Sequence, residues 1–444
     1  MKFIVRRAQR PLSGTVAIPG DKSIGHRALL FSLLSETPVH VRGLGSGADN
    51  GRSARAITEL GARIVKEPTG EGFVITDTGL DAMRPPGAQI DCGNSGTTIR
   101  LLCGLLAGQR FAATLFGDDS LNKRPMRRVI EPLVQMGASI HGLAGPSVDV
   151  TPPLVVGPAT GPLTAIEYVL PMASAQVKTA ILLAGLYADG ATTVVEPGPS
   201  RDHSERMLAY LGAPLTVDGR RTTIDTRGWN RRLAGSEFEV PADPSSAAFL
   251  IAAALVAGAD EVRLPKVCTN PTRTGFLDAI AAMGGHVALE NVRTAGPEPV
   301  ADLVVRGKAH LLQGTQIEGD LAVRSIDELP ILAVLAACAR GTTIVRDAAE
   351  LRSDRIATTC AMLRAFGITC EARADGFSVE GQFGRPFRAG EVHADADHRI
   401  AMAGAVAALA AEATSVIHDA DNVATSYPGF AEALRTLGVT ITAV

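Results

Sequence analysis

Aromatic side chains and an excess of either charge are both scarce in this chain of 444 residues. Aromatic residues make up 4% of the sequence, with one Trp and four Tyr, so there are few platforms on which nucleic-acid bases could stack. Lys and Arg number 43 against 46 Asp and Glu, which gives a formal net charge of -3. A nucleic-acid-binding domain usually carries a strong basic excess, so we exclude nucleic acid as a partner.

Cysteine motifs and long apolar runs are also missing. The six cysteines form no CxxC pair, which argues against a zinc ribbon or a thioredoxin motif, and scattered thiols fit a reducing compartment. The longest apolar run, AAFLIAAALVAGA, has about 13 residues, short of the roughly 18 that suggest a membrane span. The N-terminal MKFIVRRAQRPLSG lacks the apolar segment of a signal peptide. These absences predict a soluble, cytoplasmic protein without a membrane partner.

The sequence does contain an internal repeat of about 70 to 80 residues. One marker is a polar helix start followed by small and apolar residues, and it begins at Asp21, Asn94, Ser174, Asp243, Asp327 and Asp397. The other is a helix ending in a bulky residue and a glycine, at Gly61, Gly137, Gly212, Gly284, Gly367 and Gly438. Such a glycine is typical of a left-handed C-cap. Because both markers keep one period, they indicate six copies of a small α/β module.

The first helix of each repeat is rich in Ala, Gly and Leu and nearly free of charge. A helix that is apolar all round is buried, so we expect each repeat to wrap strands and a second helix around it. N-capping explains polar residues at the starts of these helices, but it does not explain cations. The cations near helix starts are Lys22, Arg27, Arg124, Arg127, Arg128, Arg201, Arg352, Arg355 and Arg399.

These cations have two interpretations. They could be surface groups neutralised by adjacent aspartates, or they could bind an anionic ligand, which helix N-termini and guanidinium groups both favour. Their recurrence at equivalent places in a repeat favours a ligand rich in carboxylate and phosphate. Asp327 and Glu328, in SIDELP, are similarly open to two interpretations, as helix caps or as a proton acceptor among cations. His398, in DHR, is either a helix-start residue or a ligand contact.

Taken together, the chain resembles the 5-enolpyruvylshikimate-3-phosphate (EPSP) synthases, in particular the subgroup called class II. The resemblance runs from about Leu12 to Phe430 and rests on PGDKSIGHR, GNSGTTIR, LNKRPM, ASAQVKTAILLAGL, ADPSSAAF, SIDELPILA, SDRI and DHRIAM. It implies an α/β (α+β) fold, an inside-out α/β barrel of two similar domains, each with three βαβαββ-like repeats and buried helices. One domain would comprise residues 1–20 and 241–444, the other residues 21–240, with the active site in the cleft between them.

The resemblance also implies a reaction. The enolpyruvyl group of phosphoenolpyruvate is transferred to the 5-hydroxyl of shikimate 3-phosphate and phosphate is released, on the route to chorismate and the aromatic amino acids. Phosphoenolpyruvate is protonated at its methylene, the hydroxyl attacks C2, and a tetrahedral intermediate expels phosphate. No metal or organic cofactor is expected. The expected partners are these two small molecules, and the enzyme is expected to be a monomer.

The same resemblance assigns site residues. Those implied to bind shikimate 3-phosphate are Lys22, Ser23, Arg27, Ser174, Ala175, Gln176, Ser200, Arg201, Asp327 and Arg352. Those implied to bind phosphoenolpyruvate are Lys22, Asn94, Gly96, Arg124, Gln176, Arg355 and Arg399. The implied catalytic residues are Asp327, which would take the 5-hydroxyl proton, Lys22 and Glu350. Glycine at position 96 implies sensitivity to glyphosate, because several tolerant members have alanine there.

One segment departs from the family. A Lys-Glu pair usually precedes the Ser-Asp-Arg triplet, but here ELRSDR passes directly from Arg352 to Ser353. Arg352 could supply the missing charge, and Glu350 could supply the missing acid. Two alternatives therefore stay open: transfer to a different cyclitol, and an anion-binding paralogue with weakened catalysis. Transfer to UDP-N-acetylglucosamine is disfavoured, because the segment around Arg124 lacks the reactive cysteine of that family.

Overall fold

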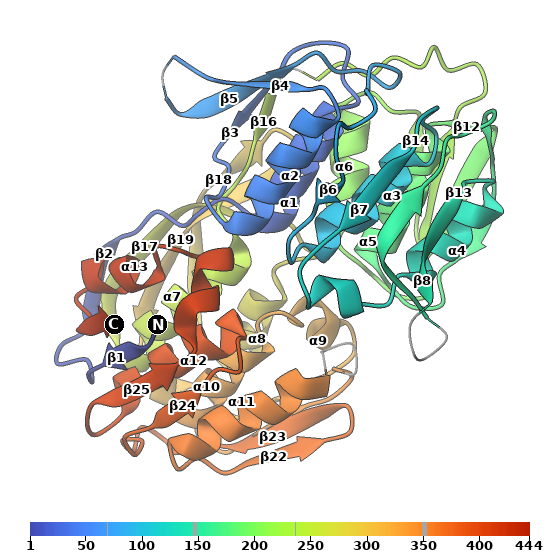
Figure 1. Cartoon of the computed structure of the whole chain (residues 1–444). Helices are drawn as coiled ribbons and strands as arrows, with labels where there is room; N and C mark the ends of the chain where they lie inside the picture. Colours follow the sequence, from blue (N-terminus) through green and yellow to red (C-terminus); the bar gives the residue numbers. More distant parts are fainter. Residues whose placement is uncertain (69, 145–148, 236, 349–352) are drawn as a thin grey trace. The chain divides into compact units, whose positions relative to one another are not determined.

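A computed structural model describes residues 1–68, 70–144, 149–235, 237–348 and 353–444 (Figure 1). The chain divides into two compact units. Unit 1 comprises Met1–Pro19, Pro241–Thr294 and Pro299–Val444, and unit 2 comprises Gly20–Val240 and Ala295–Glu298. In the part of the chain that the model covers, no helix is long and apolar enough to span a membrane.

Unit 2 contains, in its described part, three four-stranded sheets with the same strand pattern. The first two strands of each sheet are parallel, and the next two neighbours are antiparallel. In order, the sheets are β16 (Glu237–Glu239), β3 (Val39–Arg42), β5 (Gly72–Thr76) and β4 (Arg63–Lys66); β6 (Ile90–Asp91), β7 (Ala113–Phe116), β9 (Val150–Val156) and β8 (Ile140–Ala144); and β11 (Glu167–Val169), β13 (Ala191–Val195), β15 (Arg221–Asp225) and β14 (Leu215–Asp218). A short parallel pair, β10 (Leu163–Thr164) and β12 (Ala188–Asp189), accompanies them.

Unit 1 repeats this pattern in three further sheets of its described residues. They are β2 (Leu12–Thr15), β17 (Ala259–Cys268), β19 (Glu298–Gly307) and β18 (Val287–Ala295); β20 (Gln316–Ile317), β21 (Thr342–Val345), β23 (Gly376–Glu380) and β22 (Cys370–Arg373); and β24 (Glu391–His393), β25 (Ser415–His418), β1 (Phe3–Val5) and β26 (Ile441–Ala443). The first pair in each is parallel and the second antiparallel. Because β1 completes the last sheet, the N-terminus belongs to the same unit as the C-terminal half of the chain.

The expected apolar helices are present and buried. They are α1 (Lys22–Ser32), α3 (Gly96–Leu106) and α5 (Ala175–Gly185) in unit 2, and α7 (Pro244–Ala257), α10 (Leu329–Cys338) and α12 (His398–Ala407) in unit 1. Five of them begin with a side-chain N-cap, from Asp21, Ser95, Ser174, Asp243 and Asp397. The cap satisfies a backbone N–H that would otherwise lack a partner, which explains the recurring polar start.

The second helices of the repeats are α2 (Ala48–Glu59), α4 (Arg127–Gln135), α6 (His203–Tyr210), α8 (Gly275–Ala282), α11 (Ser353–Ala365) and α13 (Phe430–Thr436). The six marker glycines follow them with φ between 77° and 104°, so the expected left-handed C-caps are confirmed. Shorter helical turns complete the described elements: η1 (Leu121–Lys123), η2 (Ala309–Leu311), α9 (Asp320–Arg324), η3 (Ala408–Ala410) and η4 (Ala420–Thr425).

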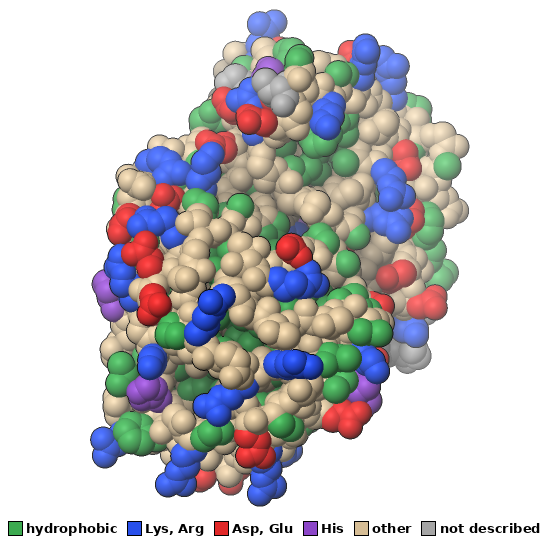
Figure 2. Space-filling view, turned by 90° about the vertical axis from the view of Figure 1, so that its left-hand side faces the viewer, with side chains coloured by type: hydrophobic (Ala, Val, Ile, Leu, Met, Phe, Trp, Pro, Cys, Tyr) green, Lys and Arg blue, Asp and Glu red, His purple; other side chains and the backbone are tan. Residues whose placement is uncertain are grey.

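Charged side chains are mixed on the surface. On the face drawn in Figure 2, Lys and Arg are interspersed with Asp and Glu, and no large area of one sign stands out. This distribution agrees with the nearly balanced composition of the chain.

Candidate functional site

The candidate residues of unit 2 lie at the starts of three buried helices. Lys22 is the first residue of α1, Gly96 of α3 and Ala175 of α5, and Ser174 caps α5 by accepting a hydrogen bond from the backbone N–H of Val177. Hydrogen bonds join the first two turns of α5 to those of α1 and α3, so these helix starts are neighbours. Three N-termini with partial positive charge thus meet at one place, which favours an anion.

Arg27 is a buried guanidinium held by neutral groups. Its Nε donates to Ser204 Oγ at 2.7 Å, Nη1 to the Ser23 carbonyl at 3.0 Å and Nη2 to Thr179 Oγ1 at 3.2 Å. Arg201 joins them, because its Nη1 donates to Ser23 Oγ at 3.4 Å. Burial lowers the pKa of Arg27 to about 10, and no carboxylate among the described residues forms an ion pair with it. A buried cation in this state is stabilised by an anion.

A second cluster of cations surrounds the start of α3. Arg100 is only 6% exposed, and its Nη1 donates to Gln176 Oε1 at 2.7 Å. Burial, together with the nearby charges of Arg128 and Arg124, lowers the pKa of Arg100 to about 10. A Cβ added to Gly96 would lie 2.7 Å from Arg100 Nη1 and 3.2 Å from Arg124 Nη1. The glycine therefore leaves space beside two guanidinium groups, and we call Arg100, Arg124 and Arg128 the α3 cation cluster.

Two amides orient this cluster. Asn94 accepts from Arg124 Nη2 at 2.5 Å and donates to Asp118 Oδ2 at 2.8 Å. Gln176 Nε2 donates to Thr97 Oγ1 at 2.9 Å, while its oxygen accepts from Arg100. The structure therefore brings Asn94, Gly96, Arg124 and Gln176 together, and it adds Arg100, which reasoning from the sequence missed. Its signal was an arginine inside the otherwise uncharged run TTIRLLCGLL.

Lys22 and Ser200 make other contacts. Lys22 Nζ pairs with Asp49 Oδ2 at 3.2 Å, with its side chain 32% exposed, so an incoming anion would compete with Asp49. Ser200 Oγ donates to Glu196, not to the Arg27 group.

Glu196 belongs to a buried ion-pair network centred on Lys178, which sequence reasoning also missed. Lys178 Nζ lies 2.6 Å from Glu196 Oε2 and 2.5 Å from Glu205 Oε1, and its side chain is 1% exposed. Burial raises the pKa of Glu205 in spite of Lys178. A lone lysine within ASAQVKTAILLAGL was the available signal.

Unit 1 holds a separate cluster of carboxylates and arginines. Asp327 Oδ1 lies 3.3 Å from Arg399 Nη2 and 3.9 Å from Arg355 Nη1, and the Asp327 carbonyl accepts from Arg399 Nη1 at 3.0 Å. Arg355 Nε donates to Asp397 Oδ2 at 2.7 Å. Burial alone would raise the pKa of Asp397, but the charge and hydrogen bond of Arg355 outweigh it and leave this pKa low. The candidate residues Asp327, Arg355 and Arg399 are therefore in contact.

A buried network lies next to Asp327. Glu328 is 3% exposed and accepts from Ser245 Oγ, and burial and the neighbouring Asp327 raise its pKa. Arg273, 4% exposed, donates to Asp243 Oδ1 at 3.1 Å and to Ser245 Oγ at 3.0 Å. Sequence reasoning missed Arg273, whose only signal was a cation in TNPTRTG. A carboxyl with a raised pKa beside a carboxylate is an arrangement suited to proton transfer.

Two of the candidates named from the sequence, Glu350 and Arg352, lie outside the described residues.

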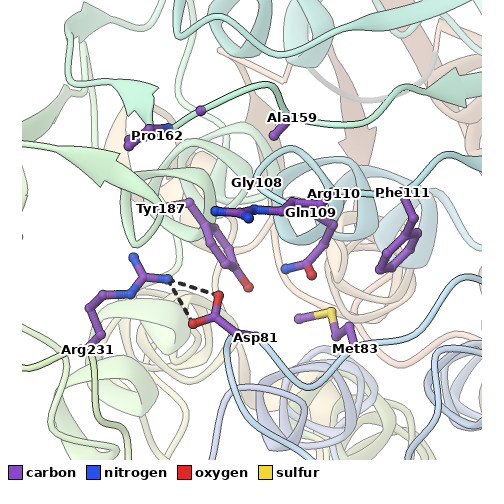
Figure 3. Close-up of a pocket in the computed structure, with 11 residues that line it drawn as sticks. Asp81, Met83, Gly108, Gln109, Arg110, Phe111, Ala159, Pro162, Tyr187 and Arg231 are labelled. Carbon is purple, nitrogen blue, oxygen red and sulfur yellow. Dashed lines mark hydrogen bonds and ion pairs between the residues drawn. The ribbon is translucent and has the colours of Figure 1, made fainter.

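Unit 2 also contains a pocket of about 520 Å³ (Figure 3). Its lining includes Gln109, which follows α3, and Tyr187, which follows α5. Arg231 pairs there with Asp81 at 3.1 Å, as the dashed lines show. The candidate residues lie at the opposite ends of these helices, and 11 helical residues span about 16 Å. We therefore treat the pocket as separate from the candidate site.

Comparisons with known proteins show the family of the chain. The family model of EPSP synthase (3-phosphoshikimate 1-carboxyvinyltransferase) matches residues 6–434. The 3-phosphoshikimate 1-carboxyvinyltransferase of Alkalilimnicola ehrlichii is 46% identical over 445 aligned positions, covering 100% of this chain and 97% of the relative. That of Geobacter sulfurreducens is 47% identical over 433 positions, covering 97% and 98%.

Solved structures show the same fold. The EPSP synthase from Acinetobacter baumannii is 39% identical, covers 100% of both chains and superimposes with a TM-score of 0.89. The enolpyruvyl transferase NikO from Streptomyces tendae has a TM-score of 0.77 over 99% of this chain and 98% of its own, but only 19% identity, so it supports the fold alone. The match over nearly the whole chain and the full-length relatives show that this chain belongs to the EPSP synthase family.

Proposed function

We propose that this chain transfers the enolpyruvyl group of phosphoenolpyruvate to the 5-hydroxyl of shikimate 3-phosphate, with release of phosphate. Membership of the EPSP synthase family supports this reaction. The structural observation that carries it is the gathering of Arg27 and the α3 cation cluster at the starts of buried helices. Arg27 and Arg100 form no ion pair with a described carboxylate. Two highly anionic substrates would supply the missing negative charge.

The two clusters of unit 2 would take different substrates. The hydroxyl-rich surroundings of Arg27, with Ser23 and Arg201, suit the phosphate and hydroxyls of shikimate 3-phosphate. The α3 cation cluster suits phosphoenolpyruvate, a small molecule with a carboxylate and a phosphate. Ser174 and Ala175 at the start of α5 would serve the first substrate, and Gln176 would serve both. Lys22 would contact both after leaving Asp49.

The residues of unit 1 would act on the same substrates. Arg355 and Arg399 would bind phosphoenolpyruvate, and Asp327 would take the proton of the 5-hydroxyl as it attacks C2. Catalysis would come chiefly from proximity, charge neutralisation and proton transfer. We assign substrate positioning, charge neutralisation and proton transfer to side chains of this chain alone. We further propose that the protein is a cytoplasmic monomer.

The missing Lys-Glu pair concerns the step in which a proton is transferred to the methylene of phosphoenolpyruvate. We propose Glu350 as the acid and Arg352 as the substitute cation. Glu350→Gln should then lower turnover about 100-fold or more, as expected for the loss of a general acid. The preceding residue is an alanine, so Ala349→Gln is a matched control that places a new amide in the same segment. Near-normal turnover of the Glu350 variant would remove Glu350 from the mechanism.

The test of the function is acceptor-dependent phosphate release. Purified protein is given phosphoenolpyruvate alone, and then with shikimate 3-phosphate, shikimate or UDP-N-acetylglucosamine. The proposal expects release with shikimate 3-phosphate in large excess over the other three conditions. Release only with another acceptor would identify a different transferase, and binding without any release would identify a weakened paralogue.

A further inference from the structure

Two adjacent strands of unit 1, β24 and β25, place two imidazoles and two carboxylates together. β24 and β25 are parallel neighbours, and their register sets His393 directly opposite His418. The two rings stack with centroids 4.6 Å apart and planes 8° from parallel. Glu391 Oε1 lies 2.9 Å from His418 Nε2, and Asp419 Oδ2 lies 3.8 Å from His393 Nδ1. We call these four residues the β24–β25 cluster.

The geometry of the cluster suits a transition metal. One ligating atom each from Glu391, His393 and His418 lie within 4.8 Å of one another. Zinc holds nitrogen and oxygen ligands at about 2.0–2.2 Å, so the side chains must rotate to place all three atoms around one ion. The side chains of Glu391 and His393 have room to rotate, because they are 72% and 64% exposed, whereas that of His418 is 27% exposed.

The types of ligand atom also indicate which metal ions the cluster would bind. Two imidazoles and a carboxylate are typical ligands of Zn²⁺, and they bind Ni²⁺ and Cu²⁺ as well, whereas Mg²⁺ and Ca²⁺ prefer sites made only of oxygen. A simple ion pair accounts for Glu391 and His418. It does not account for the second imidazole, His393, which stacks on the first and has Asp419 near its Nδ1.

We propose that Glu391, His393 and His418 form a surface site for a divalent transition metal, with Asp419 or water as the fourth ligand. The metal would join β24 to β25 and hold the segment that follows β24. That segment contains Asp395 and Ala396, both with left-handed backbone (φ 47° and 58°), and it leads to Asp397 at the start of α12. Left-handed backbone is uncommon for a residue other than glycine, and a metal on the preceding strand would fix where this segment begins. The inference does not depend on the proposed reaction.

Zinc titration tests the site. The full-length protein, without an affinity tag and after treatment with EDTA, is titrated with Zn²⁺ by calorimetry and in parallel by thermal unfolding. We expect saturable binding of one ion and a rise in Tm. His393→Asn, His418→Asn and the double variant should lose both effects. His141→Asn, an exposed histidine on β8 of unit 2, is the matched control and should retain them.

Each outcome decides the proposal. Loss of binding in the two histidine variants, with a Tm in EDTA equal to that of the wild type, supports the site. One-ion binding that survives in the double variant places the ion elsewhere and overturns it. Absence of saturable Zn²⁺ binding to the wild type also overturns it. Co²⁺ gives a second readout, since its absorption in the visible range should appear on binding and vanish in the double variant.

Discussion

At the scale of single residues, the candidate site is marked by buried cations that have no ion-pair partner among the described carboxylates. Arg27 and Arg100 are buried among hydroxyls, carbonyls and amides, and neither forms an ion pair with a described carboxylate. Gly96 lacks the side chain that would fill the space next to Arg100 and Arg124. These features cost stability in the free protein, and the binding of an anion offsets that cost.

Substitution of Gly96 tests this arrangement. In Gly96→Ala the new methyl would lie 2.7 Å from Arg100 Nη1 and 3.2 Å from Arg124 Nη1, so the guanidinium groups must shift. We expect KM for phosphoenolpyruvate to rise about tenfold, equivalent to about 1.4 kcal/mol, with a smaller change in kcat. Inhibition by glyphosate, which the family resemblance predicts for the wild type, should weaken at least as much.

Steady-state kinetics with varied phosphoenolpyruvate is the measurement. Gly51→Ala is the matched control, because a Cβ on Gly51 of α2 meets no atom within 4 Å. An unchanged KM in Gly96→Ala would separate the α3 cation cluster from phosphoenolpyruvate.

Asp327 provides a second test at this scale. Asp327→Asn keeps the size of the side chain but removes the proton acceptor between Arg355 and Arg399. We expect kcat to fall about 100-fold or more, in the range of a lost general base, with little change in the affinity for phosphoenolpyruvate. Asp260→Asn, an exposed aspartate of the same unit, controls for the substitution. A kcat within about threefold of the wild type would exclude Asp327 as the base.

At the scale of elements, the positions of the helix starts could be predicted from the sequence, but the contacts between their side chains could not. The polar starts, the apolar helix bodies and the glycine C-caps all follow from local sequence, and the structure confirms them, except that α10 has no side-chain N-cap. Arg100, Lys178 and Arg273 were missed because their roles depend on which helix faces meet. Lys178, for example, is satisfied by Glu196 and Glu205, which come later in the chain.

The buried His26 of α1 predicts a pH dependence of stability. Burial lowers its pKa from 6.5 to about 3, so it stays neutral in the folded protein while the unfolded chain takes up a proton below pH 6.5. The unfolded state then binds more protons, and stability falls as the pH decreases from 6.5 towards 3. The contribution of this group is at most about 1.4 kcal/mol per pH unit.

Urea unfolding between about pH 7 and pH 4.5, on either side of the pKa of a free histidine, measures this effect. His26→Gln should flatten the decrease, because glutamine takes up no proton, whereas His141→Gln on the surface should leave it unchanged. The same slope in His26→Gln and the wild type would contradict this prediction. Because Nδ1 of His26 bonds Ser53 Oγ at 2.8 Å, a uniform loss of stability at all pH values is expected in addition.

At the scale of the whole molecule, one module appears six times. Each described four-stranded sheet repeats the same strand pattern, and the last is completed by β1 from the N-terminus. The period of the repeat was readable from the sequence because caps and glycines are local signals. Which side chains of the helix starts within each unit come into contact was not readable, because it depends on packing between modules. The segment from 349 to 352, where the resemblance leads us to expect a Lys-Glu pair, lies outside the described residues.

The measurement that tests the central claim most directly is turnover by the chain as it stands, compared with a variant carrying Lys-Glu inserted between Arg352 and Ser353. Phosphate release from phosphoenolpyruvate is followed with and without shikimate 3-phosphate. We predict release by the unmodified chain that depends on shikimate 3-phosphate, and the inserted variant serves as a positive control. Phosphate release by the inserted variant but not by the unmodified chain would contradict the account. The residues of the unmodified chain would then bind the substrates without converting them.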